Sequence, residues 1–306
     1  MSSYKIRLPS AGFTLIELAV ALTIMALIIG GLAVPLSTRI AEQQYIETKT
    51  NIDKAVDALI GFAVLNKRLP CPDMTTAVGG LRDGTEDVAG VAGAISGCDA
   101  GSTGINTTDN AASWGDLPWR TLGLQAPDNA DAWNNRLRYA VFNPLTKQVD
   151  ASGGVTCNGA VGFAALNCTH AVAPFGAAQL DIRCANTGTP AGNQPPGCIN
   201  TGVIATTYSI TTRAVFVVYS HGGNAGGATN INDLTVAKAL PVSADELANN
   251  PQNELGALAL NIGQRRQFVT RARTTSQSLS GEFDDVLSFM SANTLAAKLL
   301  NAGVWP

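Results

Sequence analysis

The longest apolar run of this sequence lies close to its start. From Phe13 to Val34 the only charged residue is Glu17, and a helix of that length, at about 1.5 Å per residue, crosses a hydrocarbon core about 30 Å thick. After Pro35 the apolar residues recur at three- and four-residue steps or their multiples, with acids and lysines between them, which predicts an amphipathic helix. The two prolines of "LPCPD" end it near Asn66 to Arg68. Together the two halves predict a helix about 80 Å long.

The rest of the chain alternates turn-forming stretches with short apolar ones. Residues 75–110 are rich in Gly, Ala, Ser, Thr and Asp without apolar periodicity, which predicts a long loop. "DAWNNRLRYAVFNP" predicts a turn and then a strand that begins at Leu137 to Phe142. "AVFVVYSHGGNAGG" predicts a strand at Ala214 to Tyr219 that ends in a glycine turn. "FDDVLSFMSANTLAAKLLNAG" predicts a strand edge that turns into a short helix at about Ser291 to Ala302.

The flanks of the apolar run indicate the side of a membrane on which each part lies. Lys5 and Arg7 precede the run, and positive charge stays on the cytoplasmic side. The amino terminus is therefore expected in the cytoplasm and the bulk of the chain outside it. A secretory signal peptide has a shorter apolar core followed by a small-residue cleavage site. Here the small residue, Gly12, precedes the run, which is the wrong order for ordinary secretion.

Glu17 needs a counter-ion that its own helix does not supply. A charged carboxylate in lipid costs about 3 kcal/mol on insertion scales, and no Lys, Arg or His occurs between Phe13 and Pro35. The partner must come from another chain or from a charge made by processing. Cleavage after Gly12 would create a free amine on Phe13, which on a neighbouring helix shifted along the axis could meet Glu17. The alternative, a plain membrane anchor with a stray glutamate, is disfavoured by the cost of an unpaired carboxylate.

"GFTLIEL" followed by an apolar helix resembles the class III signal of type IV pilins and type II secretion pseudopilins, over roughly residues 11–35. The resemblance implies that a prepilin peptidase cuts after Gly12 and N-methylates Phe13, and that Glu17 pairs with a neighbour's N-terminus during assembly. It also implies an α+β, pilin-like fold, in which the long N-terminal helix packs on an antiparallel β-sheet head with disulfide-pinned loops. Pro35 departs from the family pattern, because it lies one place later than the usual helix-breaking proline.

The six cysteines all follow the apolar run, and none forms a CxxC pair, which disfavours zinc-binding and thioredoxin-like sites. An even number of cysteines on one side of a membrane segment favours disulfides in an oxidising compartment. Spacing does not choose among the possible pairings. We expect nearest neighbours to pair, and free buried thiols are the alternative. The expected pairs are Cys71 with Cys98, Cys157 with Cys168, and Cys184 with Cys198.

Two segments of the head extend the resemblance to the major pseudopilins. "DAWNNRLRYAV" resembles their "DPWGNPYRY" stretch, and "VVYSHGGNAGG" resembles their strand and glycine turn. Those proteins hold calcium in the following loop, near a paired-acid segment similar to "EFDDVL". The resemblance therefore implies a calcium site, which needs about six to eight oxygens; the alternative is that the paired acids only cap or solvate a turn. The candidate ligands are Asp284, Asp285, Glu282 and Ser220, with Asn224 as a further donor.

Composition and motifs disfavour catalysis and nucleic-acid binding. A net charge of −3, with 14% charged residues, offers no broad basic field and suits an extracytoplasmic, loop-rich protein. The two histidines are His170 and His221, and Ser220 cannot pair with His221 as nucleophile and base, because adjacent strand residues point to opposite faces. We expect no enzyme and no nucleic-acid partner. The tryptophans, expected in the core rather than in a stacking surface, are Trp114, Trp119, Trp133 and Trp305.

The expected organisation is a prepilin leader at residues 1–12, a transmembrane and assembly half-helix at 13–35, an amphipathic half-helix at 36–68, and a periplasmic or extracellular globular head at 69–306. The expected function is that of a structural subunit, pilin or pseudopilin, of a type IV pilus-like or type II secretion filament. The alternative is a minor pilin whose head binds a surface, DNA or cargo at the filament tip. The length of the head favours the alternative, and the likeness of "DAWNNRLRY" favours the structural subunit.

The resemblance also implies where the protein works and with which partners. Before assembly the chain is expected in the bacterial inner membrane, crossing it once with a cytoplasmic N-terminus. After assembly it is expected in a periplasmic or cell-surface filament. The implied partners are further copies or other pilin-like subunits, the prepilin peptidase, the inner-membrane assembly platform and the membrane itself.

Overall fold

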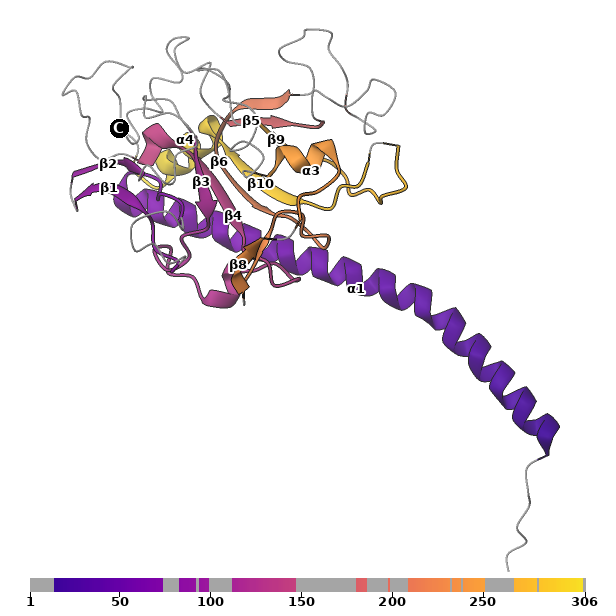
Figure 1. Cartoon of the computed structure of the whole chain (residues 1–306). Helices are drawn as coiled ribbons and strands as arrows, with labels where there is room; N and C mark the ends of the chain where they lie inside the picture. Colours follow the sequence, from indigo (N-terminus) through magenta and orange to yellow (C-terminus); the bar gives the residue numbers. More distant parts are fainter. Residues whose placement is uncertain are drawn as a thin grey trace, which may run out of the picture. The chain divides into compact units, whose positions relative to one another are not determined.

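The computed structural model describes the chain in several stretches. These are residues 14–73, 83–91, 94–98, 112–146, 180–185, 198, 209–231, 233–237, 239–250, 267–279 and 281–304. The chain divides into two compact units, Met1–Gln44 and Tyr45–Pro306. Figure 1 labels the helices and strands.

One long helix, α1, spans Leu15–Asn66. Its extent confirms the helix expected from the hydrophobic pattern, and it continues across Pro35. It ends at Lys67, whose φ of 55° takes the backbone out of the right-handed helix, while the N–H of Lys67 still donates to the carbonyl of Ala63 at 2.9 Å. In the part of the chain that the structure describes, none of the helices carries an apolar stretch of membrane-crossing length.

The head is built on a six-stranded sheet in the order β3-β4-β6-β5-β9, with β10 also paired to β6. Its pairs are antiparallel, as expected, except for the parallel pair of β5 and β9. Three of the strands correspond to predicted segments. β4 begins one residue after the predicted Leu137, β6 contains Ala214 to Tyr219, and β10 is the strand edge expected before the C-terminal helix. The bounds are β3 Ala112–Asp116, β4 Arg138–Phe142, β5 Leu180–Arg183, β6 Ser209–Ser220, β9 Gln267–Val269 and β10 Val286–Ser291.

A hairpin lies where the sequence predicted only a long loop. β1, Val88–Val91, pairs antiparallel with β2, Ala94–Cys98, in a sheet of its own. The prediction of a loop was wrong here because "VAGVAGAISGC" is dominated by glycine and alanine, which leave no apolar alternation to recognise. The remaining elements are η2 Ala126–Asn129, η3 Asn143–Thr146, β7 Thr229–Asn230, β8 Asp233–Ala237, α3 Ala244–Ala248 and α4 Ala292–Asn301. The last of these confirms the C-terminal helix.

The second half of α1 packs on one face of the sheet (Figure 1). Its buried residues recur every three or four positions and so form a single stripe. They share a cluster with side chains of β4, β6 and β10 and with Leu295 and Leu299 of α4. The alternate residues of β6, Val217 and Tyr219, face a second cluster on the other side of the sheet. The stripe of α1 is Ile52, Ala55, Leu59 and Ala63, each at most 1% exposed.

Two disulfides lie in the described part of the head. Cys71 is bonded to Cys98 and Cys184 to Cys198, with Cα–Cα distances of 5.3 and 5.6 Å. Both are the nearest-neighbour pairs expected from the sequence. The third expected pair, residues 157 and 168, lies outside the described residues.

Of the tryptophans expected in the core, Trp114 is buried, whereas Trp119 and Trp133 are half-buried. Trp305 lies outside the described residues, as does His170.

Candidate functional site

The first turn of α1 is closed by reciprocal contacts between Thr14 and Glu17. The backbone N–H and the hydroxyl of Thr14 donate to Oε2 of Glu17 at 3.4 and 3.3 Å, and the N–H of Glu17 donates to the Thr14 hydroxyl at 3.3 Å. This is a capping box, which satisfies N–H groups that a helix start leaves unpaired. The carboxylate also lies at the positive end of the helix dipole. Glu17 therefore has a local role in its own helix.

The side chains around Glu17 are apolar and exposed. Leu15 is 89% exposed and Ile16 is 74% exposed, and every residue from Thr14 to Ile28 is exposed. Apolar surface of this extent is unfavourable in water. The first half of α1 therefore needs lipid or other helices around it.

The predicted processing residues, Gly12 and Phe13, lie outside the described residues. Thr14, the capping residue, follows Phe13 directly in the chain. A cut after Gly12 would therefore create the new amine one residue before the cap that holds Glu17.

Three acids from two segments form a cluster in the head. Glu246 belongs to α3, and Asp284 and Asp285 directly precede β10. One carboxylate oxygen of each residue lies within 4.8 Å of the others. The cluster thus contains the paired acids that the sequence singled out and one acid that it did not.

Amide donors hold two of these carboxylates in place. Oε1 of Glu246 accepts from the backbone N–H of Asp284 and from the side-chain amide of Asn224, both at 3.0 Å. The backbone N–H of Asn224 donates in turn to Oδ2 of Asp284 at 2.8 Å. These contacts require the backbone of the glycine turn to approach Asp284 closely. Gly222 has a φ of +63°, and a Cβ there would lie 2.4 Å from the carbonyl oxygen of Asp284. Glycine is required by both the φ and the close approach.

Burial and repulsion from neighbouring acids oppose the ionisation of Glu246 and Asp284. Burial raises the pKa of Glu246 to about 8, and the charges of Asp285 and Asp284 act in the same direction. Burial also raises the pKa of Asp284, again with the charge of Asp285 adding to it. Oδ1 of Asp284 is buried without a hydrogen-bond partner in the described structure. The cluster therefore combines excess negative charge with an unused oxygen, a combination that a cation would relieve.

His221 lies against this cluster. It is 1% exposed, and its Nδ1 is 3.8 Å from Oδ1 of Asp285. Within the described residues neither ring nitrogen has a hydrogen-bond partner. Asp285 is held on its other oxygen by the amide of Asn249, at 2.7 Å.

The other two candidate ligands have different surroundings. The hydroxyl of Ser220 donates to Oδ2 of Asp131 at 2.7 Å and accepts from the N–H of Gly222 at 3.0 Å. This contact joins β6 to the "DAWNN" turn, so the Ser220 hydroxyl is engaged there rather than with the acids. Glu282 is half-buried, and its charge contributes to the raised pKa of Asp284.

Glu246 is the residue of this cluster that sequence reading missed. It lies 38 positions before Asp284. The available signal was "SADE", an S-x-x-E pattern typical of a helix start. That pattern predicts the short helix α3, but it does not predict that Glu246 of this helix contacts the distant Asp284.

The chemistry of the cluster suits a hard divalent cation. Carboxylate oxygens are the preferred ligands of calcium, and the set contains no sulfur donor. Glu246, Asp284 and Asp285 would hold the ion, whose positive charge would offset their repulsion. These three residues therefore fit a calcium ion chemically, whereas Ser220 and Glu282, the other ligands that the sequence implied, lie outside the group of three.

Comparison with known proteins identifies the N-terminal segment. The prokaryotic N-terminal methylation motif matches residues 7–33, a range that includes Gly12, Phe13 and Glu17. No curated protein and no solved structure matches the chain. The motif implies processing by a prepilin peptidase, anchoring in the inner membrane and co-assembly, and pilin-like proteins are typically non-enzymatic structural subunits. Together with a long helix packed on a mostly antiparallel sheet, this motif indicates the type IV pilin and pseudopilin family.

Proposed function

We propose that this chain is a structural subunit of a type IV pilus-like or type II secretion filament. It assembles through its N-terminal helix after cleavage behind Gly12 and N-methylation of Phe13. One observation carries the proposal: a single carboxylate, Glu17, lies in a helix whose apolar side chains are all exposed as far as Ile28. Such a helix is built to be covered by lipid and then by copies of itself.

The electrostatics of Glu17 support this assembly route. When helices bundle, their apolar side chains become buried against one another, and Glu17 is taken away from water with them. A carboxylate in those surroundings needs a cation within reach. The amine of Phe13 on an adjacent copy is the cation that processing creates. Since each copy carries one such acid and one such amine, the contact can repeat from copy to copy.

Before assembly, the chain lies in the inner membrane as a single pass with its N-terminus in the cytoplasm. There the prepilin peptidase and the assembly platform act on it. After assembly, the head lies in a periplasmic or cell-surface filament.

The test is a Glu17→Ala variant. We expect it to insert and to be cleaved normally but to be depleted from filaments. Removing one member of a buried ion pair costs about 3 kcal/mol per contact, because the remaining amine is left unpaired. The matched control is Glu47→Ala, since Glu47 is an exposed glutamate of the same helix. The measurement is the ratio of subunit in sheared filaments to subunit in the membrane fraction.

Mass spectrometry of the same samples shows where the mature chain begins and whether its first residue is methylated. A mature chain that begins at methylated Phe13 is expected for both variants. Wild-type filament yield from Glu17→Ala would contradict the proposal, as would normal filaments made of chains that still begin at Met1.

We also propose that the acid cluster of Glu246, Asp284 and Asp285 binds calcium and stabilises the head. The support is the 4.8 Å grouping of three carboxylates, the raised pKa values of Glu246 and Asp284, and the unpartnered Oδ1 of Asp284. A cation there would offset the repulsion between the carboxylate of α3 and the two carboxylates before β10, and so add to the hydrogen bonds that already join these segments. Glu282 remains a candidate for a further ligand. The dependence of stability on pH and calcium tests this proposal.

A further inference from the structure

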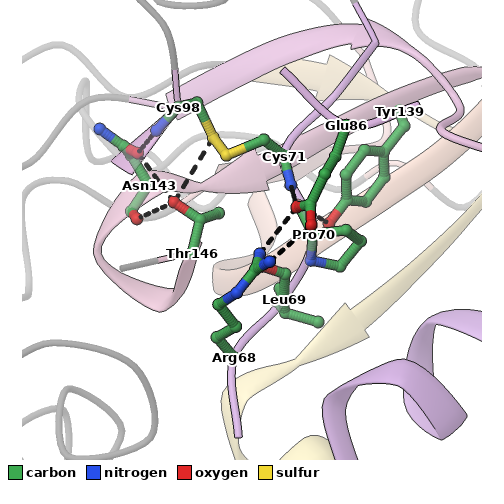
Figure 2. Close-up of a disulfide and its surroundings, with 9 residues drawn as sticks. All are labelled: Arg68, Leu69, Pro70, Cys71, Glu86, Cys98, Tyr139, Asn143 and Thr146. Carbon is green, nitrogen blue, oxygen red and sulfur yellow. Dashed lines mark hydrogen bonds and ion pairs between the residues drawn. A yellow bond between two sulfur atoms is a disulfide. The ribbon is translucent and has the colours of Figure 1, made fainter. Parts of the chain in front are cut away.

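The Cys71–Cys98 disulfide lies in a polar network that holds its two cysteines separately (Figure 2). Cys71 follows the end of α1 by a few residues, and its backbone is fixed on both sides. The N–H of Cys71 donates to Oε2 of Glu86 at 3.0 Å. The carbonyl of the preceding residue, Pro70, accepts from the hydroxyl of Tyr139 at 3.1 Å. None of these contacts involves the sulfur, so they can form in the reduced chain.

A buried ion pair supports the cysteine from the same side. Arg68 places two guanidinium nitrogens on the two carboxylate oxygens of Glu86, one of them at 2.7 Å. The two side chains are only 5% and 14% exposed. The backbone N–H of Glu86 donates to the hydroxyl of Thr121 at 2.9 Å, which fixes the position of the acid. A bidentate pair of this kind is both strong and directional.

Cys98 is held from the other side by η3. Its N–H donates to Oδ1 of Asn143 at 3.4 Å, and its Sγ lies 3.4 Å from the hydroxyl of Thr146. That hydroxyl donates to the carbonyl of Asn143 at 2.8 Å. Cys98 also faces Val88 across the β1–β2 hairpin, and Val88 lies two residues after Glu86. The ion pair and the hairpin therefore connect the two cysteines through a short path.

We propose that the Arg68–Glu86 ion pair positions Cys71 against Cys98 before oxidation and thereby selects this pairing from the alternatives. The disulfide closes a sequence separation of 27 residues, whereas the ion pair closes one of 18. Once the ion pair and the hairpin have formed, little of the loop-closure entropy remains to be lost. Glu86 is thus a positioning residue: it holds the backbone of Cys71 but does not react.

The reaction itself is thiol–disulfide exchange with a disulfide oxidant. The thiolate of one cysteine attacks the oxidant and forms a mixed disulfide, which releases one oxidant thiol. The second cysteine then attacks the mixed disulfide and releases the other oxidant thiol. Two electrons and two protons pass to the oxidant, and one sulfur–sulfur bond forms in the protein. The second step is intramolecular, so its rate rises when the two cysteines are already held close together.

The test follows oxidative refolding of the reduced full-length chain in detergent. Oxidised and reduced glutathione serve as the redox buffer, free thiols are trapped by alkylation at successive times, and mass spectrometry identifies each disulfide. In Glu86→Gln we expect Cys71–Cys98 to form at least about tenfold more slowly relative to Cys184–Cys198 in the same sample. We also expect mispaired forms of Cys71 to accumulate.

The matched control is Asp245→Asn, which breaks another buried ion pair, with Arg271. Both side chains of that pair are at most 2% exposed. It should leave the ratio of the two rates unchanged, because a general loss of stability slows both disulfides alike. An unchanged ratio in Glu86→Gln, or an equal change in Asp245→Asn, would overturn the proposal.

If the Glu86→Gln variant forms neither disulfide, the Glu86→Asp variant provides the test. It keeps the charge but shortens the reach of the carboxylate. Slower formation of Cys71–Cys98 alone supports a positioning role, and equal slowing of both disulfides rules it out.

Discussion

At the scale of single residues, Glu246 has a distinctive titration behaviour. It is 2% exposed, and burial, together with the charge of Asp285, raises its pKa from 4.5 to about 8. The folded protein therefore keeps a proton that the unfolded chain releases above about pH 4.5. The stability that this proton contributes is fully present below about pH 4.5 and is lost as the pH rises through about 8. A bound cation would replace the proton and prevent that loss.

We therefore expect the unfolding free energy of chelator-treated protein to fall between about pH 5 and pH 8, and added calcium to oppose the fall. Glu246→Gln should flatten the fall and lose the response to calcium, whereas Glu47→Gln, on an exposed face of α1, should change neither. The measurement is urea unfolding followed by tryptophan fluorescence, with EDTA or with calcium.

The comparison between variants matters because Asp73 also contributes to the pH dependence. Burial raises its pKa to about 7, which gives a slope of the same sign in every variant. A wild-type stability at about pH 8 that does not respond to calcium would remove the calcium proposal.

At the scale of elements, α1 consists of two halves with different surroundings. The residues of the first half as far as Ile28 are exposed, whereas the second half buries a stripe that includes Leu59. Polar contacts add to this packing: the amide of Asn51 donates to the carbonyl of Ala130 at 2.9 Å, and the hydroxyl of Thr48 accepts from the N–H of Ala132 at 3.1 Å. The second half is thus an integral part of the head.

Two neighbouring substitutions in α1 should therefore have opposite effects. Leu59→Ala should destabilise the head by about 2–5 kcal/mol, because Leu59 is completely buried and a cavity would remain. Gly61→Ala should stabilise it by about 1 kcal/mol, since Gly61 is exposed within the helix and a Cβ there meets nothing within 4 Å. Urea unfolding measures both changes. A cost below about 1 kcal/mol for Leu59→Ala would mean that this half of α1 is not docked as described.

At the scale of the whole molecule, the proposed contact between copies links two different surfaces. The acid of one chain meets the amine of another, so every added copy presents the same unused groups again. A head-to-tail contact of this kind produces an open helical assembly unless the rotation closes it into a ring. Nothing in such a contact limits the subunit to one end of the filament.

The expected distribution is therefore uniform. Gold labelling of an epitope tag on the head should mark filaments at regular intervals along their whole length, in immuno-electron micrographs. Labelling confined to the tips would favour the alternative of a minor pilin with a binding head, and a chain absent from filaments would contradict both.

The sequence by itself determined the features that depend on local pattern. The extent of α1, the strands within β4 and β6, and α4 follow from the spacing of apolar residues and from prolines that exclude helix. The role proposed for Glu17 also rests on the sequence, because a single acid among apolar residues stands out without any structure. The predicted nearest-neighbour pairing is also confirmed for the two disulfides Cys71–Cys98 and Cys184–Cys198.

Only the tertiary structure decided which distant polar side chains meet. Glu246 joins Asp284 across 38 positions, and Arg68 joins Glu86 across 18. Neither contact has a periodic signature, because each depends on where separate segments lie after the core has formed. The hairpin of β1 and β2 was missed for a related reason: its small residues bury too little apolar surface to leave a pattern. Buried apolar side chains recur at regular spacing along the chain, so the sequence predicts them. A single polar contact between distant residues has no such repeat, so only the tertiary structure shows it.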